Sequence, residues 1–167
     1  MANRYPLTID GTTIEEMQNG DTVILPISSA ALQIKLINID EPSTVSATAA
    51  TGTINFDITT QSILYYTTNA SGNFTINFRG SSGTTLSSLM ATGDAISVSF
   101  LCTNGTTAYY NSAVQVDGTG TGVTTRWQGG TAPTSGNASS IDVYNYVIIK
   151  TAATPTYTVL ASQTKFA

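Results

Sequence analysis

The sequence contains no histidine, and this absence removes several kinds of catalytic chemistry at once. Without an imidazole the chain lacks the base of a Ser-His-Asp or Cys-His site and the commonest zinc ligand. Cys102 is the only cysteine, so neither a disulfide within the chain nor a CxxC site is available. Because Cys102 continues the apolar alternation of Ile96, Val98 and Phe100, we expect a buried and unreactive thiol.

Charged residues are also scarce, at 10% of the chain against about 25% in average soluble proteins. The net charge of -4 and the pI near 4.4 are opposite to those of a nucleic-acid-binding domain, which depends on clustered Lys and Arg. No stretch approaches the ~20 apolar residues of a membrane-spanning helix, and the first residues lack the apolar core of a secretion signal. We therefore predict that the protein does not bind nucleic acid, does not insert into a membrane and carries no secretory signal.

Hydroxyl side chains take the place of the missing charges. The chain has 30 Thr, 17 Ser and 14 Gly among its 167 residues. Threonine favours strands, whereas Lys and Glu do not, so this bias predicts an all-β protein. Hydroxyls also cost less to desolvate than charges, which suits a surface that packs against neighbouring molecules.

The few charges are unevenly distributed, which suggests two parts. Residues 1–42 hold six acidic and two basic residues, and residues 43–167 hold four of each. We predict an N-terminal attachment or oligomerisation segment over 1–42, which includes a first strand at 31–40, followed by a β-sandwich domain over 43–167. The segment looks too short to enclose its own apolar side chains, so we expect these to contact other copies or other proteins: Tyr5, Leu7, Ile9, Ile14, Met17, Val23 and Leu25.

From residue 51 onward, apolar and polar residues alternate as in strands. About eight strands are expected, with one short helical turn near Leu86, and this pattern indicates a β-sandwich of jelly-roll type. We expect hairpins between the strands near 63–68 and 74–79, and between 95–104 and 111–116 around the Asn104-Gly105 turn. The tetrapeptide TINF occurs at 53–56 and 75–78, which we interpret as convergence of two strands rather than as a duplicated unit.

The remaining candidates for catalytic residues are the four carboxylates of residues 43–167. They are considered because a glycosidase needs only two acidic groups close together. Asp94 and Asp117 lie where Asp serves turn geometry, and Asp57 and Asp142 alternate with apolar neighbours, as solvent-facing strand residues do. We therefore expect no catalytic residue, no metal site and no cofactor. A polysaccharide depolymerase remains a third alternative.

The aromatic residues offer the best candidates for a binding site. Trp127, the only tryptophan, lies in the loop-forming stretch TRWQGGTAPTSGN at 125–137. An indole there serves either as an anchor for a long loop or as a platform on which a sugar stacks, and we favour the anchor. Tyr66, Tyr109 and Tyr110 are further candidates for stacking or for a subunit interface.

Several runs of the chain resemble structural proteins of tailed phages. RYPLTIDGTTIEEMQNGDTVIL is similar to the N-terminal segments of virion and tail-fibre proteins. Three runs, TGTINFDITTQSILYYTTNASGNFTINFRG, WQGGTAPTSGNASSIDVYNY and YTVLASQTKF, resemble a β-rich domain of marine phages, especially those infecting cyanobacteria. These motifs are structural rather than catalytic, and they cover most of the chain.

The resemblance implies a non-enzymatic structural protein on the exterior of the virion, as a fibre, a head decoration or a tail accessory. It implies synthesis in the host cytoplasm, a homotrimer joined through the N-terminal segment, and contacts with other virion proteins. The alternative is a host-glycan-binding adhesin or carbohydrate-binding module, with Trp127 and the outward tyrosines on the sugar.

Overall fold

The computed structural model describes residues 7–10, 13–16 and 41–167. The chain divides into two compact units, Met1–Ile39 and Asp40–Ala167. In the first unit, β1 (Leu7–Asp10) and β2 (Thr13–Glu16) form an antiparallel ladder in which Ile9 is opposite Ile14. The expected strand at 31–40 lies outside the described residues.

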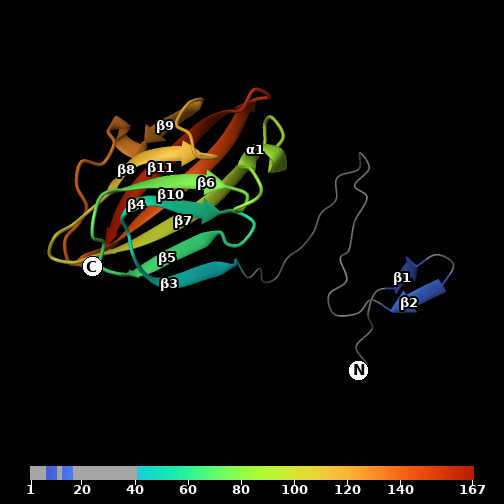
Figure 1. Ribbon diagram of the computed structural model, residues 1–167, viewed down its shortest axis with the longest axis horizontal. Coiled ribbons are helices and arrows are strands. Elements are labelled where there is room, and N and C mark those ends of the chain that lie inside the picture. The colour runs from blue at the N-terminus through green and yellow to red at the C-terminus, as the bar shows by residue number, and fades with distance from the viewer. Residues whose placement is uncertain (1–6, 11–12, 17–40) are drawn as a thin grey trace. The chain divides into compact units, whose positions relative to one another are not determined.

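The second unit is an all-β domain of two sheets, as the composition predicts (Figure 1). The small sheet has the order β4-β6-β8 and consists of β4 (Gly52–Asp57), β6 (Phe74–Arg79) and β8 (Asn111–Val116). The large sheet has the order β3-β5-β7-β10-β11-β9 and consists of β3 (Ser43–Ala49), β5 (Ile63–Thr68), β7 (Ala95–Asn104), β10 (Ser140–Ala152), β11 (Thr156–Phe166) and β9 (Val123–Trp127).

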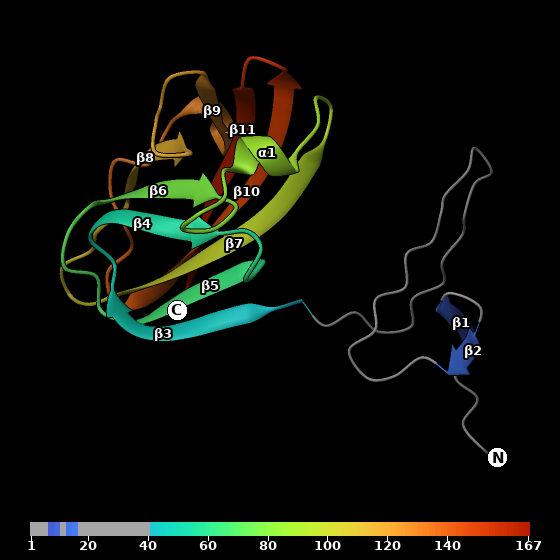
Figure 2. The ribbon, with the colours of Figure 1, turned by 45° about the vertical axis from the view of Figure 1, so that its right-hand side comes forward.

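From β3 to β8 the chain alternates between the two sheets. Successive strands of the same sheet are therefore parallel: β3 pairs with β5, β5 with β7, β4 with β6, and β6 with β8. Parallel neighbours need a crossover connection, and here the opposite sheet supplies it, so short corners are enough. The chain thus winds around one core in successive turns, here called coils, each made of one strand from each sheet. The two layers are clearest in Figure 2. Strand β10 then reverses direction and pairs antiparallel with both β7 and β11.

The core between the sheets is rich in aromatic rings. Phe74 lies edge-on to Phe100 and to Tyr144, with ring centroids 5.3 and 5.6 Å apart. Phe78 approaches Tyr146 at 5.0 Å. All five of these side chains are at most 1% exposed. Edge-to-face pairs of this kind stabilise a core beyond the area that they bury.

The two copies of the repeated tetrapeptide TINF lie side by side in adjacent strands, β4 and β6. The interpretation of the repeat as convergence did not predict this pairing. The two TINF copies are neighbours in register, with Ile54 beside Ile76 and Phe56 beside Phe78. The amide of Asn77 donates to that of Asn55 over 2.8 Å. The repeat therefore occupies the same position in two successive coils.

Two details of the expected topology differ from the structure. Both expected hairpins are wrong, because β5 and β6 lie in different sheets, as do β7 and β8. The jelly-roll form is not confirmed, since all four strand pairs among β3 to β8 are parallel. The helical turn near Leu86 is confirmed as α1 (Leu86–Leu89). Thr85 caps its N-terminus, because the Thr85 side chain accepts a hydrogen bond from the Ser88 N–H.

Several acidic protons are buried in this core, and they make the stability depend on pH. Burial, with a smaller contribution from the Asp142 charge, raises the pKa of Cys102 to about 12. Burial also raises the pKa of Tyr144 and Tyr146 well above the ordinary tyrosine value. In the unfolded chain these groups ionise near their ordinary values of about 8.5 for Cys and about 10 for Tyr.

Stability should therefore be complete below about pH 8.5 and fall progressively toward pH 12, because the unfolded chain releases these protons first. The measurement is the urea midpoint by circular dichroism at pH 7, 9 and 11. In a Cys102→Ala variant the decline should begin nearer pH 10. A midpoint that stays constant up to pH 11 would contradict this expectation.

Candidate functional site

Trp127 lies at the end of β9, one of the two edge strands of the large sheet. Its ring is half-buried and packs against the hydrophobic core, edge-on to Tyr144 at 6.5 Å and to Tyr146 at 6.3 Å between ring centroids. Because the small sheet has only three strands, it leaves this side of the large sheet thinly covered. Trp127 therefore covers core tyrosines from the edge, which is the position that a loop anchor requires.

Trp127 also contributes to two hollows on the surface. One, of about 340 Å³, is lined on the outer face of the large sheet by Arg126, Asn145, Val147 and Leu160, among others. The second, also about 340 Å³, lies between the following loop and β11, where Gln128, Pro133 and Gln163 contribute. The exposed part of the indole is thus available to a ligand as well.

A second interaction fixes the loop after Trp127: the buried carboxylate of Asp142 on β10 accepts hydrogen bonds from it. Asp142 is 0% exposed. Its Oδ2 accepts from Asn104 Nδ2 at 3.0 Å, from the backbone N–H of Asn137 at 2.9 Å and from Gln163 Nε2 at 2.9 Å. Its Oδ1 accepts from Asn137 Nδ2 at 2.7 Å. Four amide donors, rather than a cation, compensate the buried charge.

The Asp142 network joins two loops at one end of the sandwich. Asn104, the last residue of β7, also bonds both the N–H and the carbonyl of Tyr109. Gly136 packs so closely against this segment that a Cβ there would collide with the Tyr109 carbonyl oxygen, so only glycine fits. The Asn104 side chain therefore shapes a longer crossover to β8, which is why no two-residue hairpin turn forms.

The expectation that Asp142 faces solvent is wrong. Asp142 lies on the same face of β10 as Tyr144 and Tyr146, and that face is buried. Simple alternation with Ile141 and Val143 did not reveal which face was the core, because both faces of β10 carry apolar residues. Nothing in the local sequence indicated that Asn137 and Gln163 bind the Asp142 carboxylate.

The other three carboxylates of the domain are also engaged by the protein itself. Asp57 Oδ1 accepts from Arg79 Nε at 2.6 Å. Asp94 Oδ2 accepts from the Ala91 N–H at 2.7 Å. Asp117 lies in the turn that the sequence predicts, and its two oxygens accept from the N–H groups of Leu86 and Ser87 at 2.6 and 3.0 Å. Each carboxylate thus fixes a loop, a turn or a strand neighbour.

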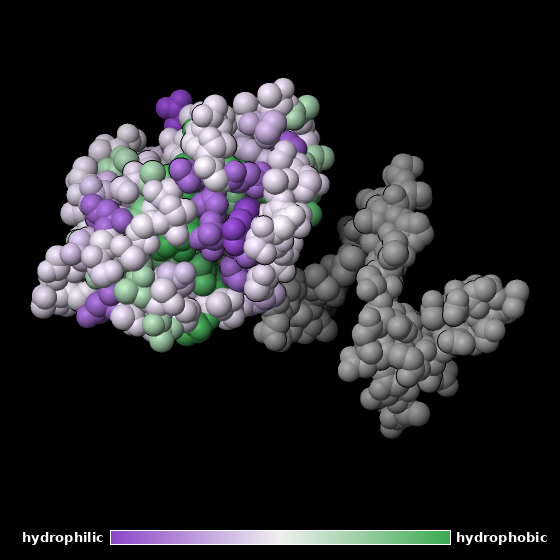
Figure 3. All heavy atoms as spheres, in the orientation of Figure 1, coloured by the Kyte–Doolittle hydropathy of each residue, from purple (hydrophilic) through white to green (hydrophobic). Residues whose placement is uncertain are grey.

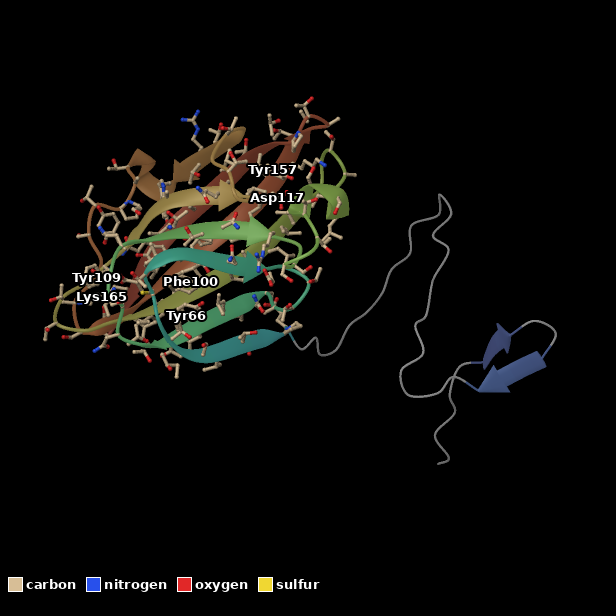
Figure 4. All side chains as sticks on the ribbon, in the orientation of Figure 1. Tyr66, Phe100, Tyr109, Asp117, Tyr157 and Lys165 are labelled. Atoms are coloured by element: carbon tan, nitrogen blue, oxygen red, sulfur yellow. The ribbon has the colours of Figure 1, made fainter. Side chains whose placement is uncertain are left out.

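One buried cation holds the segment around α1 on the large sheet. Lys150 on β10 is 6% exposed, and its Nζ donates to the carbonyl oxygens of Ser87 and Met90, each at 2.8 Å. These carbonyls lie at the C-terminal part of the helical turn, where a positive charge is favourable. Figure 4 shows Asp117 and Tyr157 near this end of the domain.

The three tyrosine candidates are all half-buried. Tyr66 packs edge-on against Phe100, with centroids 5.3 Å apart (Figure 4). Tyr109 packs against the core. Tyr109 and Tyr110 lie in the connection between β7 and β8 rather than in a strand, and they do not share an element with Trp127.

The expected assembly residues belong to the first unit. Leu7, Ile9 and Ile14 lie in β1 and β2, whereas Tyr5, Met17, Val23 and Leu25 lie outside the described residues. Within the described part of the chain, no three Cys, Asp or Glu residues gather as metal ligands do. No helix among those residues is long and apolar enough to cross a membrane.

Comparison with known proteins adds no identification. No family model matches the chain, and no curated protein or solved structure matches it significantly.

Replacing the Asp142 carboxylate with an amide should destabilise the domain. In Asp142→Asn an NH₂ group faces groups that are themselves donors, and unfolding should become easier by about 2 kcal/mol or more, because a buried polar group is left unsatisfied. The measurement is urea unfolding followed by circular dichroism. Asp94→Asn is the matched control, and its exposed site should lose less than about 1 kcal/mol. Equal losses in the two variants would contradict the assignment.

Truncating Trp127 tests the anchor against the platform. Trp127→Ala should lower the free energy of unfolding by about 2 kcal/mol, less than for a fully buried ring. Trp127→Phe should restore part of that loss, and Arg126→Ala on the neighbouring exposed position should change it by less than about 0.5 kcal/mol. An unchanged stability combined with lost sugar binding would identify a platform instead.

Proposed function

We propose that the chain is a non-enzymatic structural protein on the exterior of a tailed-phage particle, which assembles through its N-terminal segment. The observation that carries the non-enzymatic part is the use of Asp57, Asp94, Asp117 and Asp142. All four accept hydrogen bonds that hold the fold together. A carboxylate pair acting on a glycosidic bond needs a free acid and a free base or nucleophile.

The surface of the domain supports a role in assembly. Figure 3 shows hydrophilic side chains gathered on the face of the small sheet, beside broad pale areas of intermediate hydropathy. Large apolar side chains are exposed singly at Val45, Leu89, Leu160 and Phe166. The pale areas of intermediate hydropathy cost less free energy to desolvate against a neighbouring molecule than a charged surface does. The resemblance to virion proteins supplies the particle as the place of that assembly.

A second candidate function is binding of a host surface glycan. The hollows beside Trp127 favour it, because they combine a partly exposed indole with the amide side chains of Gln128, Asn145 and Gln163. Sugars are commonly bound by an aromatic face together with a few polar groups. Binding of the intact protein to a glycan array, lost in Gln128→Ala but kept in Gln115→Ala, would distinguish this role from purely structural assembly.

The assembly role is tested in the β1–β2 hairpin, with particle incorporation as the readout. We expect Ile9→Asp with Ile14→Asp to leave residues 41–167 folded and to reduce incorporation into particles at least about tenfold, because charge at an apolar contact is not compensated. The matched control is Thr8→Lys with Thr13→Lys, which adds two charges to the same strands at positions opposite Glu15 and Asp10, where opposite charges are favourable.

Incorporation is measured by quantitative mass spectrometry of purified particles, with antibody labelling of their exterior. Equal incorporation of both double variants would contradict assembly through this segment. Absence of the wild-type protein from purified particles would overturn the virion role itself. Cleavage of a host polysaccharide that is lost in a folded Asp57→Asn variant would instead establish the depolymerase.

A further inference from the structure

The large sheet has an outer face, which points away from the core. On β7 the side chains of Val98, Phe100 and Cys102 are buried in the core, so the residues between them point outward. All six strands lie in the described part of the chain, and among their outward-pointing residues Arg126 is the only charged one. A sheet face that meets water normally carries polar and charged side chains. The scarcity of charge therefore favours contact of this face with protein.

Apolar side chains form a continuous row across four strands of this outer face. In register, Val45 lies beside Tyr65, Tyr65 beside Leu101, and Leu101 beside Val143. Val45 is 65% exposed, and the other three side chains are half-buried although they point away from the core. The next outward-pointing pair of β10 and β11 is also apolar, Ile141 and Phe166. Contiguous apolar surface of this kind marks an interaction site.

The outer face of the small sheet has the opposite character. It carries Asn55, Asp57, Arg79 and Gln115, and Asp57 and Arg79 form an ion pair there. Figure 3 shows the hydrophilic side chains gathered on that face. The domain therefore has one face suited to water and one nearly uncharged face suited to a partner.

One cation and one anion lie at the two borders of the large sheet. Arg126 is on β9, and Glu41 lies two residues before the start of β3. Strands β9 and β3 are the two edges of the sheet, at opposite borders in Figures 1 and 2. Both side chains are exposed, and Ser62 Oγ donates to Glu41 Oε2 at 3.3 Å, which holds the carboxylate at its border.

The two charges also lie at the same level along the strands. The row through the cation consists of Arg126, Leu160, Val147 and Ser97. The neighbouring row includes Ser43 and Ser99. Since β3 and β7 run in the same direction, Glu41 is level with Ser97. Arg126 and Glu41 therefore mark the two ends of one row.

These two charges cannot meet within one chain, because the six strands hold them roughly 24 Å apart at about 4.8 Å per strand. A two-fold axis parallel to the strands, midway between β7 and β10, brings β9 of one copy over β3 of another. Arg126 of each copy then lies opposite Glu41 of the other. Two-fold interfaces are self-complementary in this way.

We propose that the outer face of the large sheet is an interface between two copies of this chain, packed as aligned sheets about that axis. The apolar row lies at the centre of the interface, with Val143 of one copy over Leu101 of the other, and the Arg126–Glu41 pairs lie at its two borders. Sheets that pack face to face keep their strands within about 30° of each other.

The size of the face fits this assignment. Six strands about 4.8 Å apart and about 33 Å for the ten residues of β7 give a face of roughly 800 Å². A specific interface of standard size covers about 800 Å² on each partner. The dimer also covers the hollow lined by Asn145, Val147 and Leu160. A glycan would therefore bind only in the second hollow beside Trp127, next to Gln163.

The first test places a charge at the centre of the interface. Sedimentation equilibrium is measured on the full chain with Ile9→Asp and Ile14→Asp, which removes association through β1 and β2. We expect a dimer of twice the 17.4 kDa chain mass. Val143→Lys should raise its dissociation constant at least about tenfold, because the ammonium group is buried without a partner. The matched control is Ala113→Lys on the exposed face of β8, which should leave the dissociation constant unchanged.

The second test exchanges the charges at the borders. Arg126→Glu should raise the dissociation constant at least about tenfold, because it places two carboxylates opposite each other at both borders. Adding Glu41→Arg should restore it to within about threefold of the starting value. Adding Asp94→Arg instead gives the same net charge, but it should not restore the dimer, since Asp94 lies before β7 rather than at the β3 border.

A monomer in the starting protein, or equal weakening by Val143→Lys and Ala113→Lys, would overturn the proposal. Open-ended polymers would overturn it as well, because they would indicate pairing of β9 with β3 edge to edge. Failure of Glu41→Arg to restore the Arg126→Glu variant would overturn the two-fold arrangement. These measurements use the isolated protein, so their outcome is independent of whether the chain belongs to a virion.

Discussion

The in-register pairing of parallel strands is the constraint on which the rest of the domain depends. Because side chains alternate between the faces of a strand, one register decides at once which residues enter the core. Here it stacks Ile54 on Ile76 and Phe56 on Phe78, and it places Asp57 beside Arg79. The aromatic core and the polar outer face of the small sheet both follow from that single choice.

The long antiparallel strands β10 and β11 extend the large sheet beyond β7. Strand β10 pairs with β7 over ten residue positions and brings Asp142, Tyr144, Tyr146 and Lys150 to the inner face. Its two buried charges lie at opposite ends of the strand. Asp142 accepts hydrogen bonds from amide donors, and Lys150 donates to carbonyls of the helical turn. Both ends of the sandwich are therefore closed by a charge on one strand that binds loop backbone from elsewhere in the chain.

Composition and alternation were enough to predict strands, two layers and the helical turn. They could not predict which strands become neighbours, since parallel and antiparallel strands share the same period of two. Asn104-Gly105 has the sequence of a hairpin turn, yet the Asn104 side chain binds Tyr109 and Asp142 and holds a crossover instead. The spacing of the two TINF copies was the sign in the sequence that β4 and β6 pair in parallel. For the candidate site, Trp127 was identifiable because it is unique, whereas the Asp142 network depends on partners up to 38 positions away.

The segment that carries α1 shows how this architecture tolerates growth. The step from β4 to β6 is 22 residues, and the step from β6 to β8, between residues 76 and 114, is 38. Ten of the additional 16 residues lie in the corner between β6 and β7, which spans 80–94, whereas the corner between β4 and β5 spans 58–62. This corner is tied down by Asp117 and Lys150, and residues 75–78 of β6 still pair in register with 113–116 of β8. Lengthening an exposed loop costs little entropy. The corner at Ser82-Gly83, which is exposed, is therefore a natural place for a foreign peptide to be displayed without disturbing the coils on either side.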